Sequence, residues 1–135
     1  MIRGLNHVTL SVSDLKRSLD FYTALLGFKP AATWSVGAYL KGGDLWLCLS
    51  LDQAVRKEAP EEDTHIAFTV SDKDFGIFSR SLMERKVPVW KENRSEGRSI
   101  YFLDPDGHKL EIHVGCLESR LRFLRREPWE GLQLY

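Results

Sequence analysis

The chain has 135 residues, 43% hydrophobic and 28% charged, which suits one compact soluble domain. Nineteen basic residues balance nineteen acidic ones and no basic stretch is rich in aromatics, so nothing favours a nucleic-acid partner. No apolar run approaches the roughly 20 residues that cross a bilayer, and the N-terminus lacks the apolar region of a signal peptide. Cys48 and Cys116 can form at most one disulfide, so we expect a reduced, cytoplasmic protein without membrane partners.

An internal repeat predicts the architecture. The segment 7–14 is echoed by the segment 65–72, with four identical positions. In both copies apolar residues alternate after a histidine, as in a half-buried strand, and Ser-Asp then precedes a helical pattern. The repeat therefore predicts two similar modules, each opening with a strand that runs into a helix.

The other predicted elements follow in chain order. The first helix ends at Gly27 and gives way to extended segments with a turn at 42–44. The second helix is followed by extended segments that flank a hairpin turn at 104–107, and a last helix spans about 117–126. The apolar stripes of the first two helices are Leu15, Leu19, Tyr22 and Leu26, and then Phe75, Phe78, Leu82 and Met83.

Both halves therefore read β-α-β-β-β, and the expected fold class is α+β with cupped mixed sheets. Module 1 covers about residues 4–51 and module 2 about 64–115, within a single domain that also includes the C-terminal helix. One module alone leaves the concave face of its sheet uncovered. Two modules can complete a cup, either within one chain or by exchange between two chains.

Alternation along the strands predicts a metal site. His7 and His65 point away from the apolar faces of their strands, and Glu111 does so on the last strand. Two imidazoles and a carboxylate suit a divalent first-row ion and leave positions for substrate. Cys48 stands where the repeat places a fourth ligand; a zinc-binding thiolate is one interpretation, but three protein ligands are favoured because lone buried cysteines are usually apolar. His113 shares the face of Glu111 and is an alternative ligand.

Two other features carry weaker signals. His108 lies beside the hairpin turn and is expected at the surface. The polar segment 91–99 has the composition of a solvated loop. Its basic and hydroxyl residues, with Arg120, also suit a phosphate-like dianion, whereas its oxygen-rich residues around Gly97 suit a monovalent cation.

The sequence resembles the fosfomycin-resistance glutathione transferases of the FosA type, in the vicinal oxygen chelate (glyoxalase–bleomycin resistance) superfamily. The likeness runs from residue 4 to about 122. The strand and helix pattern marks only the superfamily, whereas Lys91 with the 93–99 loop is specific to the family. The matching segments are 4–7, 44–50, 64–65, 90–97, 101–108 and 110–111.

The resemblance implies a vicinal oxygen chelate fold whose modules are exchanged in a homodimer. Each metal site would take His7 from one subunit, and His65 and Glu111 from the other. It implies Mn²⁺ as the metal, K⁺ in the loop, and addition of glutathione to the epoxide of fosfomycin.

The resemblance also implies roles for individual residues. Thr9 and Tyr39 are expected to be catalytic, Thr9 by hydrogen bonding to the oxirane oxygen and Tyr39 by assisting formation of the glutathione thiolate. The substrate pocket would consist of Lys91, Ser95, Tyr101 and Arg120, with Trp46 and Cys48 as its apolar wall. The potassium loop would use Asn93, Ser95, Glu96, Gly97 and Ser99. The glutathione channel would be lined by Trp34, Ser50 and Arg94.

Several competing functions share this fold. An extradiol dioxygenase can use the same ligands with iron, but does not need Lys91, Arg120 and a serine-rich loop together. A glyoxalase I is disfavoured by Cys48, and an epoxide hydrolase needs a carboxylate, which Gly37 does not provide. A relative using cysteine or bacillithiol stays possible. A metal-free drug-binding module of the bleomycin-resistance kind, or a purely structural dimerisation domain, leaves His7, His65 and Glu111 unexplained.

Overall fold

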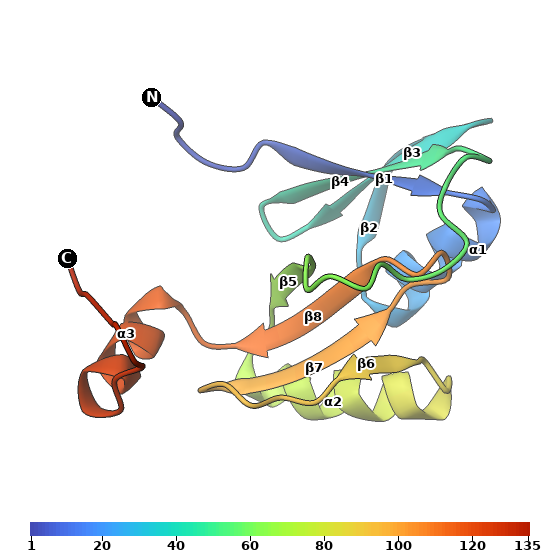
Figure 1. The fold of residues 1–135 in the computed structure, drawn as a ribbon. Coiled ribbons are helices and arrows are strands. Elements are labelled where there is room, and N and C mark those ends of the chain that lie inside the picture. Colours follow the sequence, from blue (N-terminus) through green and yellow to red (C-terminus); the bar gives the residue numbers. More distant parts are fainter.

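A computed structural model describes all residues, 1–135. The first module forms a four-stranded sheet in the order β1-β4-β3-β2, in which only β1 and β4 are parallel (Figure 1). Between β1 and β2 the chain forms one continuous helical segment. The elements are β1 (His7–Val12), α1 (Leu15–Asp20), the π-helical turn η1 (Phe21–Leu25), β2 (Lys29–Trp34), β3 (Gly37–Gly42) and β4 (Leu45–Leu51).

The second module repeats this topology. Its sheet has the order β5-β8-β7-β6, with β5 and β8 parallel, and α2 lies along one face of it (Figure 1). The paired βαβββ modules and the C-terminal helix predicted from the sequence are confirmed. None of the helices is long and apolar enough to cross a membrane. The elements are β5 (Ile66–Thr69), α2 (Asp72–Glu84), β6 (Val89–Lys91), β7 (Arg98–Leu103), β8 (Lys109–Val114) and α3 (Leu117–Arg126).

Local sequence signals explain the opening of each module. Leu10 and Val12 of β1 are buried, while His7 and Thr9 on the opposite face are exposed, as alternation requires. The helices that follow begin at the predicted caps. The Asp14 side chain accepts a hydrogen bond from the backbone of the third residue beyond it, and Ser71 does the same for α2.

The helical segments depart from the prediction in two ways. The first helix widens into the π-helical turn η1, where Phe21, Tyr22 and Leu25 are buried, and Leu26 directly after it is buried too. Phe21 and Leu25 thus join the predicted stripe residues Tyr22 and Leu26 in the core. Met83, expected on the apolar stripe of α2, is 70% exposed, because the stripe follows Phe75, Phe78 and Leu82 instead.

The helix-covered faces of both sheets share one apolar core. Phe21 of η1 contacts Phe102 of β7, and Phe28 packs edge-on against Phe68 of β5. Burying these faces against each other leaves the histidine-bearing face of each sheet directed outward. The chain therefore carries two half-cups rather than one closed cup.

Two carboxylates in the β7–β8 turn fasten the second module to the first. Asp104 accepts a hydrogen bond from the Tyr22 hydroxyl at 2.8 Å, and burial together with this charge raises the pKa of Tyr22 well above its ordinary value. Asp106 accepts from the backbone N–H and hydroxyl of Ser13 and from Arg17. Burial alone raises the pKa of Asp106, but these hydrogen bonds and the Arg17 charge outweigh it and lower the pKa.

His108 also contributes to the contact between the two modules. Its Nε2 lies 2.7 Å from the Ser11 carbonyl oxygen, and its Nδ1 lies 3.1 Å from the Arg56 guanidinium. The prediction that His108 is a surface residue is therefore wrong. The turn folds back onto β1 instead of projecting into solvent, a long-range contact that no local pattern signals.

We expect Asp106→Asn to destabilise the protein by about 1–3 kcal/mol, because the buried hydrogen bonds to a charged acceptor are weakened. The pKa of Asp106 is lowered on folding, so its contribution is complete above the ordinary aspartate value of about 4 and is lost as pH falls through the lowered value. The melting-temperature difference between wild type and variant should therefore be large at pH 7 and narrow in acid.

Asp44→Asn, at the exposed β3–β4 turn of the other module, is the matched control and should melt like the wild type. Equal melting temperatures for Asp106→Asn and Asp44→Asn at pH 7 would show that the turn does not fasten the modules.

Candidate metal and substrate site

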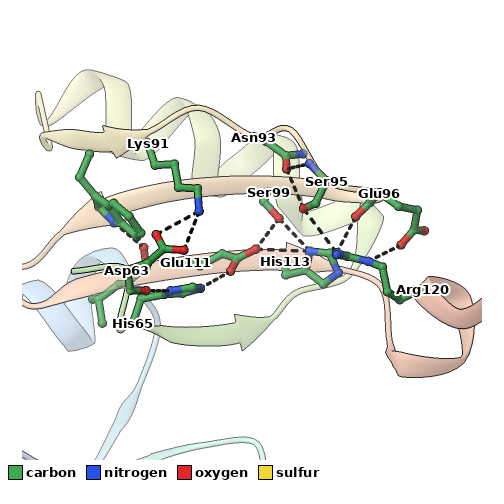
Figure 2. Close-up of polar contacts among 12 residues, drawn as sticks. Asp63, His65, Lys91, Asn93, Ser95, Glu96, Ser99, Glu111, His113 and Arg120 are labelled. Atoms are coloured by element: carbon green, nitrogen blue, oxygen red, sulfur yellow. Dashed lines mark hydrogen bonds and ion pairs between the residues drawn. The ribbon is translucent and has the colours of Figure 1, made fainter. Parts of the chain in front are cut away.

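Half of the predicted metal site is assembled on the second sheet. Glu111 lies on β8, only 6% exposed, and its Oε2 is 2.9 Å from His65 Nε2 (Figure 2). His65 stands immediately before β5, which is parallel to β8. A sheet register that pairs Ala67 with Glu111 brings the two side chains together.

The hydrogen bonds of His65 suit a metal ligand. Its Nδ1 lies 2.6 Å from the carbonyl oxygen of Asp63, which can only accept, so Nδ1 carries a proton. This assignment leaves Nε2, on the side of Glu111, as the coordinating nitrogen. Metal-bound histidines commonly use a backbone carbonyl in this way. An imidazole and a carboxylate so placed fit a divalent first-row ion.

His7 lies apart from this pair, on the first sheet. It is exposed, its Nδ1 lies 2.7 Å from the Asn6 side-chain oxygen, and its ring stacks at 4.5 Å on Trp46. No three potential ligands among His, Cys, Asp and Glu come together within the chain. The structure thus brings His65 and Glu111 together but does not bring His7 to them.

An aromatic row crosses the outward face of the first sheet. From His7 on β1 it continues through Trp46 on β4 and Tyr39 on β3 to Trp34 on β2, with ring centroids 4.5, 5.1 and 4.8 Å apart. All four side chains are exposed, and exposed groups of aromatic rings commonly mark surfaces that contact a ligand or another protein.

Smaller side chains complete that face. Thr9 pairs with Cys48 across β1 and β4, one step along from His7 and Trp46. Ser50 lies two residues beyond Cys48, opposite Ser11. Cys48 is a free, partly buried thiol, so it can serve as wall or as ligand. The predicted residues Thr9, Tyr39, Trp46, Cys48, Trp34 and Ser50 thus all belong to the first sheet.

A matching aromatic group surrounds His65 on the second sheet. Its ring lies 5.5 Å from Trp90 and 5.7 Å from Tyr101. The ammonium group of Lys91 stands 5.3 Å from the Tyr101 ring centre and forms an ion pair with Asp63, with N···O distances of 2.9 and 3.0 Å. This hydrogen bond lowers the pKa of Asp63 and raises that of Lys91.

The 93–99 loop contacts the C-terminal helix. Arg120 at the start of α3 donates to the Glu96 carboxylate at 3.1 Å and to its backbone oxygen at 2.8 Å, and reaches Ser95 Oγ at 3.4 Å (Figure 2). Asn93 closes the loop by accepting from the Ser95 backbone and donating to the Gly97 carbonyl. These contacts bring together Ser95 and Arg120, two of the predicted anion-binding residues.

Sequence patterns missed Asp63, which contacts both His65 and Lys91 but lies in a variable-looking linker with no periodic signal. They also missed one role of Ser99, which was predicted only in the potassium loop. Its hydroxyl donates to Glu111, and its oxygen lies 2.7 Å from His113 Nδ1. Arg94 is exposed on the same loop. A cavity of about 670 Å³ lies along β5 between the modules, and none of the predicted site residues lines it. It is an apolar cleft, so we assign the chemistry to the polar half-cup instead.

The fold and the paired ligand site define a class of protein. The profile of the Glyoxalase/Bleomycin resistance protein/Dioxygenase superfamily matches residues 4–112, and the chain belongs to this superfamily. Its relatives include the glutathione transferase FosA of Serratia marcescens, 52% identical over 98% of this chain and 95% of that protein. The metallothiol transferase FosB of Staphylococcus haemolyticus is 40% identical over 93% of each chain.

Solved structures agree. The fosfomycin resistance protein FosX of Mesorhizobium loti superposes with a TM-score of 0.76 at 32% identity, covering 90% of this chain and 99% of that one. A FosX mutant from Listeria monocytogenes, in complex with Mn(II) and 1S,2S-dihydroxypropylphosphonic acid, has a TM-score of 0.79 at 28% identity with the same coverage. The resemblance to the FosA-type family is confirmed.

Proposed function

We propose that this protein is a metal-dependent thiol transferase that adds glutathione to the epoxide of fosfomycin. The observation that carries the proposal is that His65 and Glu111 meet on the second sheet next to Tyr101 and Lys91, while Ser95 and Arg120 contact each other at the adjoining loop (Figure 2). A metal site next to cationic and hydroxyl groups suits a substrate that presents an oxirane and a phosphonate together. The 52% identity to FosA supports this substrate and this thiol.

The metal belongs to the proposal, with His7, His65 and Glu111 as its ligands. Mn²⁺ is favoured because a related FosX structure contains Mn(II). Bound by these residues, the ion would supply Lewis acidity that stabilises negative charge on the oxirane oxygen. Thr9, one step from His7 on the same face, donates a hydrogen bond to that oxygen.

Other side chains bind the reactants. Lys91, Ser95, Tyr101 and Arg120 hold the phosphonate, and Trp46 with Cys48 forms the wall beside the epoxide carbons. Tyr39 donates a hydrogen bond that stabilises the glutathione thiolate, and the thiol proton is released to solvent. The thiolate sulfur forms a bond to an epoxide carbon as the carbon–oxygen bond breaks, and the resulting alkoxide oxygen takes a proton from solvent. Trp34, Ser50 and Arg94 line the glutathione approach. The oxygens of the 93–99 loop bind K⁺, which offsets the charge of the dianion.

A homodimer with exchanged modules is part of the proposal. His7 and the aromatic row occupy the outward face of one sheet, and His65 with Glu111 occupies that of the other, while the opposite faces share a core. Facing half-cups from two chains would unite all three ligands. A cytoplasmic location is also proposed, since both cysteines are free thiols.

Hydrolysis is the main alternative reaction, since a FosX relative was crystallised with a dihydroxy phosphonate. A water-activating carboxylate was sought from the sequence near Gly37. There the Trp34 indole and the Leu49 backbone carbonyl occupy the space where a Cβ would lie, so no side chain fits. This packing favours a thiol as the nucleophile.

Offered glutathione, cysteine and bacillithiol at equal concentration, the protein should consume glutathione fastest, with little diol. Product analysis by mass spectrometry measures this preference. Diol as the main product in the presence of glutathione would replace the transferase with a hydrolase, and a bacillithiol adduct as the main product would reassign the thiol.

The Asp63–Lys91 ion pair predicts an effect on substrate affinity. Because the carboxylate competes with the phosphonate for the Lys91 ammonium group, Asp63→Asn should lower the KM for fosfomycin about two- to fivefold, the range of a weak exposed ion pair. The kcat should change little. Steady-state kinetics with varied fosfomycin measure both constants, and Asp72→Asn, which removes the exposed ion pair with Arg98, is the control. A raised KM would instead mean that Asp63 orients Lys91 for binding.

A further inference from the structure

Glu111 has a second polar partner on the side away from His65. The Ser99 hydroxyl donates to Glu111 Oε1, and the same hydroxyl oxygen lies 2.7 Å from His113 Nδ1. A serine hydroxyl has one proton, and the carboxylate receives it, so Nδ1 must be the donor in the second bond. Figure 2 shows the resulting chain of hydrogen bonds, which runs from His113 through Ser99 to Glu111.

The backbone packs closely around His113. A Cβ built on Gly97 would lie 2.7 Å from His113 Cε1, and one built on Gly115 would lie 2.6 Å from Nε2. Both glycines have positive φ, 87° and 150°. Only glycine allows the main chain to approach the ring this closely in that conformation. The imidazole is therefore packed on both sides and its side chain is only 18% exposed.

This geometry argues against His113 as a direct ligand, the alternative left open by its position on β8. Nδ1 is engaged with Ser99 and lies 3.5 Å from Glu111 Oε1, beyond the usual N–H···O range of about 2.7–3.2 Å. Nε2 lies against the backbone of Gly115. Both ring nitrogens are therefore unsuited to coordinate an ion held by His65 and Glu111.

We propose that His113 is a positioning residue for the metal centre. This proposal rests on the proposed function of that site. It fixes the Ser99 hydroxyl, which holds Glu111 Oε1 and so orients the carboxylate with Oε2 toward His65 and the metal. Outer partners of ligating carboxylates typically account for 10- to 100-fold of metal affinity. Neither His113 nor Ser99 touches the metal or the reacting atoms in this scheme.

The test is Mn²⁺ affinity of the full chain, measured from the electron paramagnetic resonance signal of free Mn²⁺ and independent of turnover. His113→Phe keeps a ring but removes the N–H donor and should weaken binding about 10- to 100-fold. Ser99→Ala should weaken it by a similar factor, and the double variant no further, because both act through one chain of bonds. His113→Asn, whose amide N–H can take the place of Nδ1, should largely restore affinity.

The inference would be overturned if His113→Phe bound Mn²⁺ with wild-type affinity; if that variant does not fold, Ser99→Ala serves in its place. It would also be overturned if the affinity losses of the two single variants multiplied in the double variant, or if His113→Asn bound Mn²⁺ as weakly as His113→Phe. Glu111→Gln separates this failure from that of the site itself. If Glu111→Gln also binds Mn²⁺ normally, the proposed metal site fails and the positioning role fails with it.

Discussion

Replacing Glu111 with glutamine should remove most metal binding and slow adduct formation by about two to three orders of magnitude. Glutamine keeps the size of the side chain and an oxygen acceptor for Ser99, but it removes the negative charge facing His65. We expect the Mn²⁺ affinity to fall more than about 100-fold, beyond the range for outer partners. The turnover rate should fall roughly 10²- to 10³-fold, because charge stabilisation in the transition state is weakened. Calorimetric titration with Mn²⁺ and steady-state kinetics measure the two effects.

Glu84→Gln is the matched control for this prediction. Glu84 is an exposed carboxylate at the end of α2, so its loss should leave metal binding and turnover at wild-type values. If Glu111→Gln behaved like Glu84→Gln in the metal titration, Glu111 would be a structural partner of His65 and Ser99 and not a ligand.

Mixing two inactive chains should restore activity if each site is shared between subunits. His7→Ala removes the ligand from the first sheet, and Glu111→Ala removes the ligand from the second. Each variant alone should be inactive. In a mixed dimer one site receives wild-type His7 from one chain and wild-type Glu111 from the other. Random exchange of equal amounts should therefore recover about a quarter of the wild-type activity, since half the dimers are mixed and each has one intact site.

The measurement requires subunit exchange by mild denaturation and refolding of the mixture. Mixing two variants of the same half-site, His65→Ala with Glu111→Ala, provides the control and should recover nothing, because every site lacks one ligand. Activity recovered in that control would contradict sites shared in this way. So would a refolded mixed dimer of His7→Ala and Glu111→Ala that recovers no activity.

Short-range patterns predicted the fold well. The repeat that begins at His7 and His65, the alternation of Leu10 and Val12 with exposed neighbours, and the helix caps at Asp14 and Ser71 are local signals, and the structure confirms the elements they predict. The π-helical turn at Phe21 was not predicted. Its stability depends on packing between η1 and residues such as Phe102, which are distant in the sequence.

The candidate site was only partly predictable for the same reason. Face assignment along single strands selected His7, His65 and Glu111, but could not show that a single chain brings only the last two together. The roles of Asp63 and His113 depend on side-chain contacts across strands and loops. His108 was misplaced because the turn that carries it packs against β1 of the other module. Such contacts leave no periodic trace in the sequence.

The most direct test of the account follows the fate of fosfomycin itself. Metal-free protein is incubated with fosfomycin and glutathione, with and without Mn²⁺ and K⁺, and the phosphorus NMR spectrum is recorded over time. We expect a glutathione adduct that forms only with Mn²⁺, faster with K⁺, and far more slowly with Glu111→Gln. Metal binding with fosfomycin left intact would contradict the transferase and direct attention to catechol substrates. Failure of both Mn²⁺ and fosfomycin to bind would contradict the metal site and favour a drug-binding module.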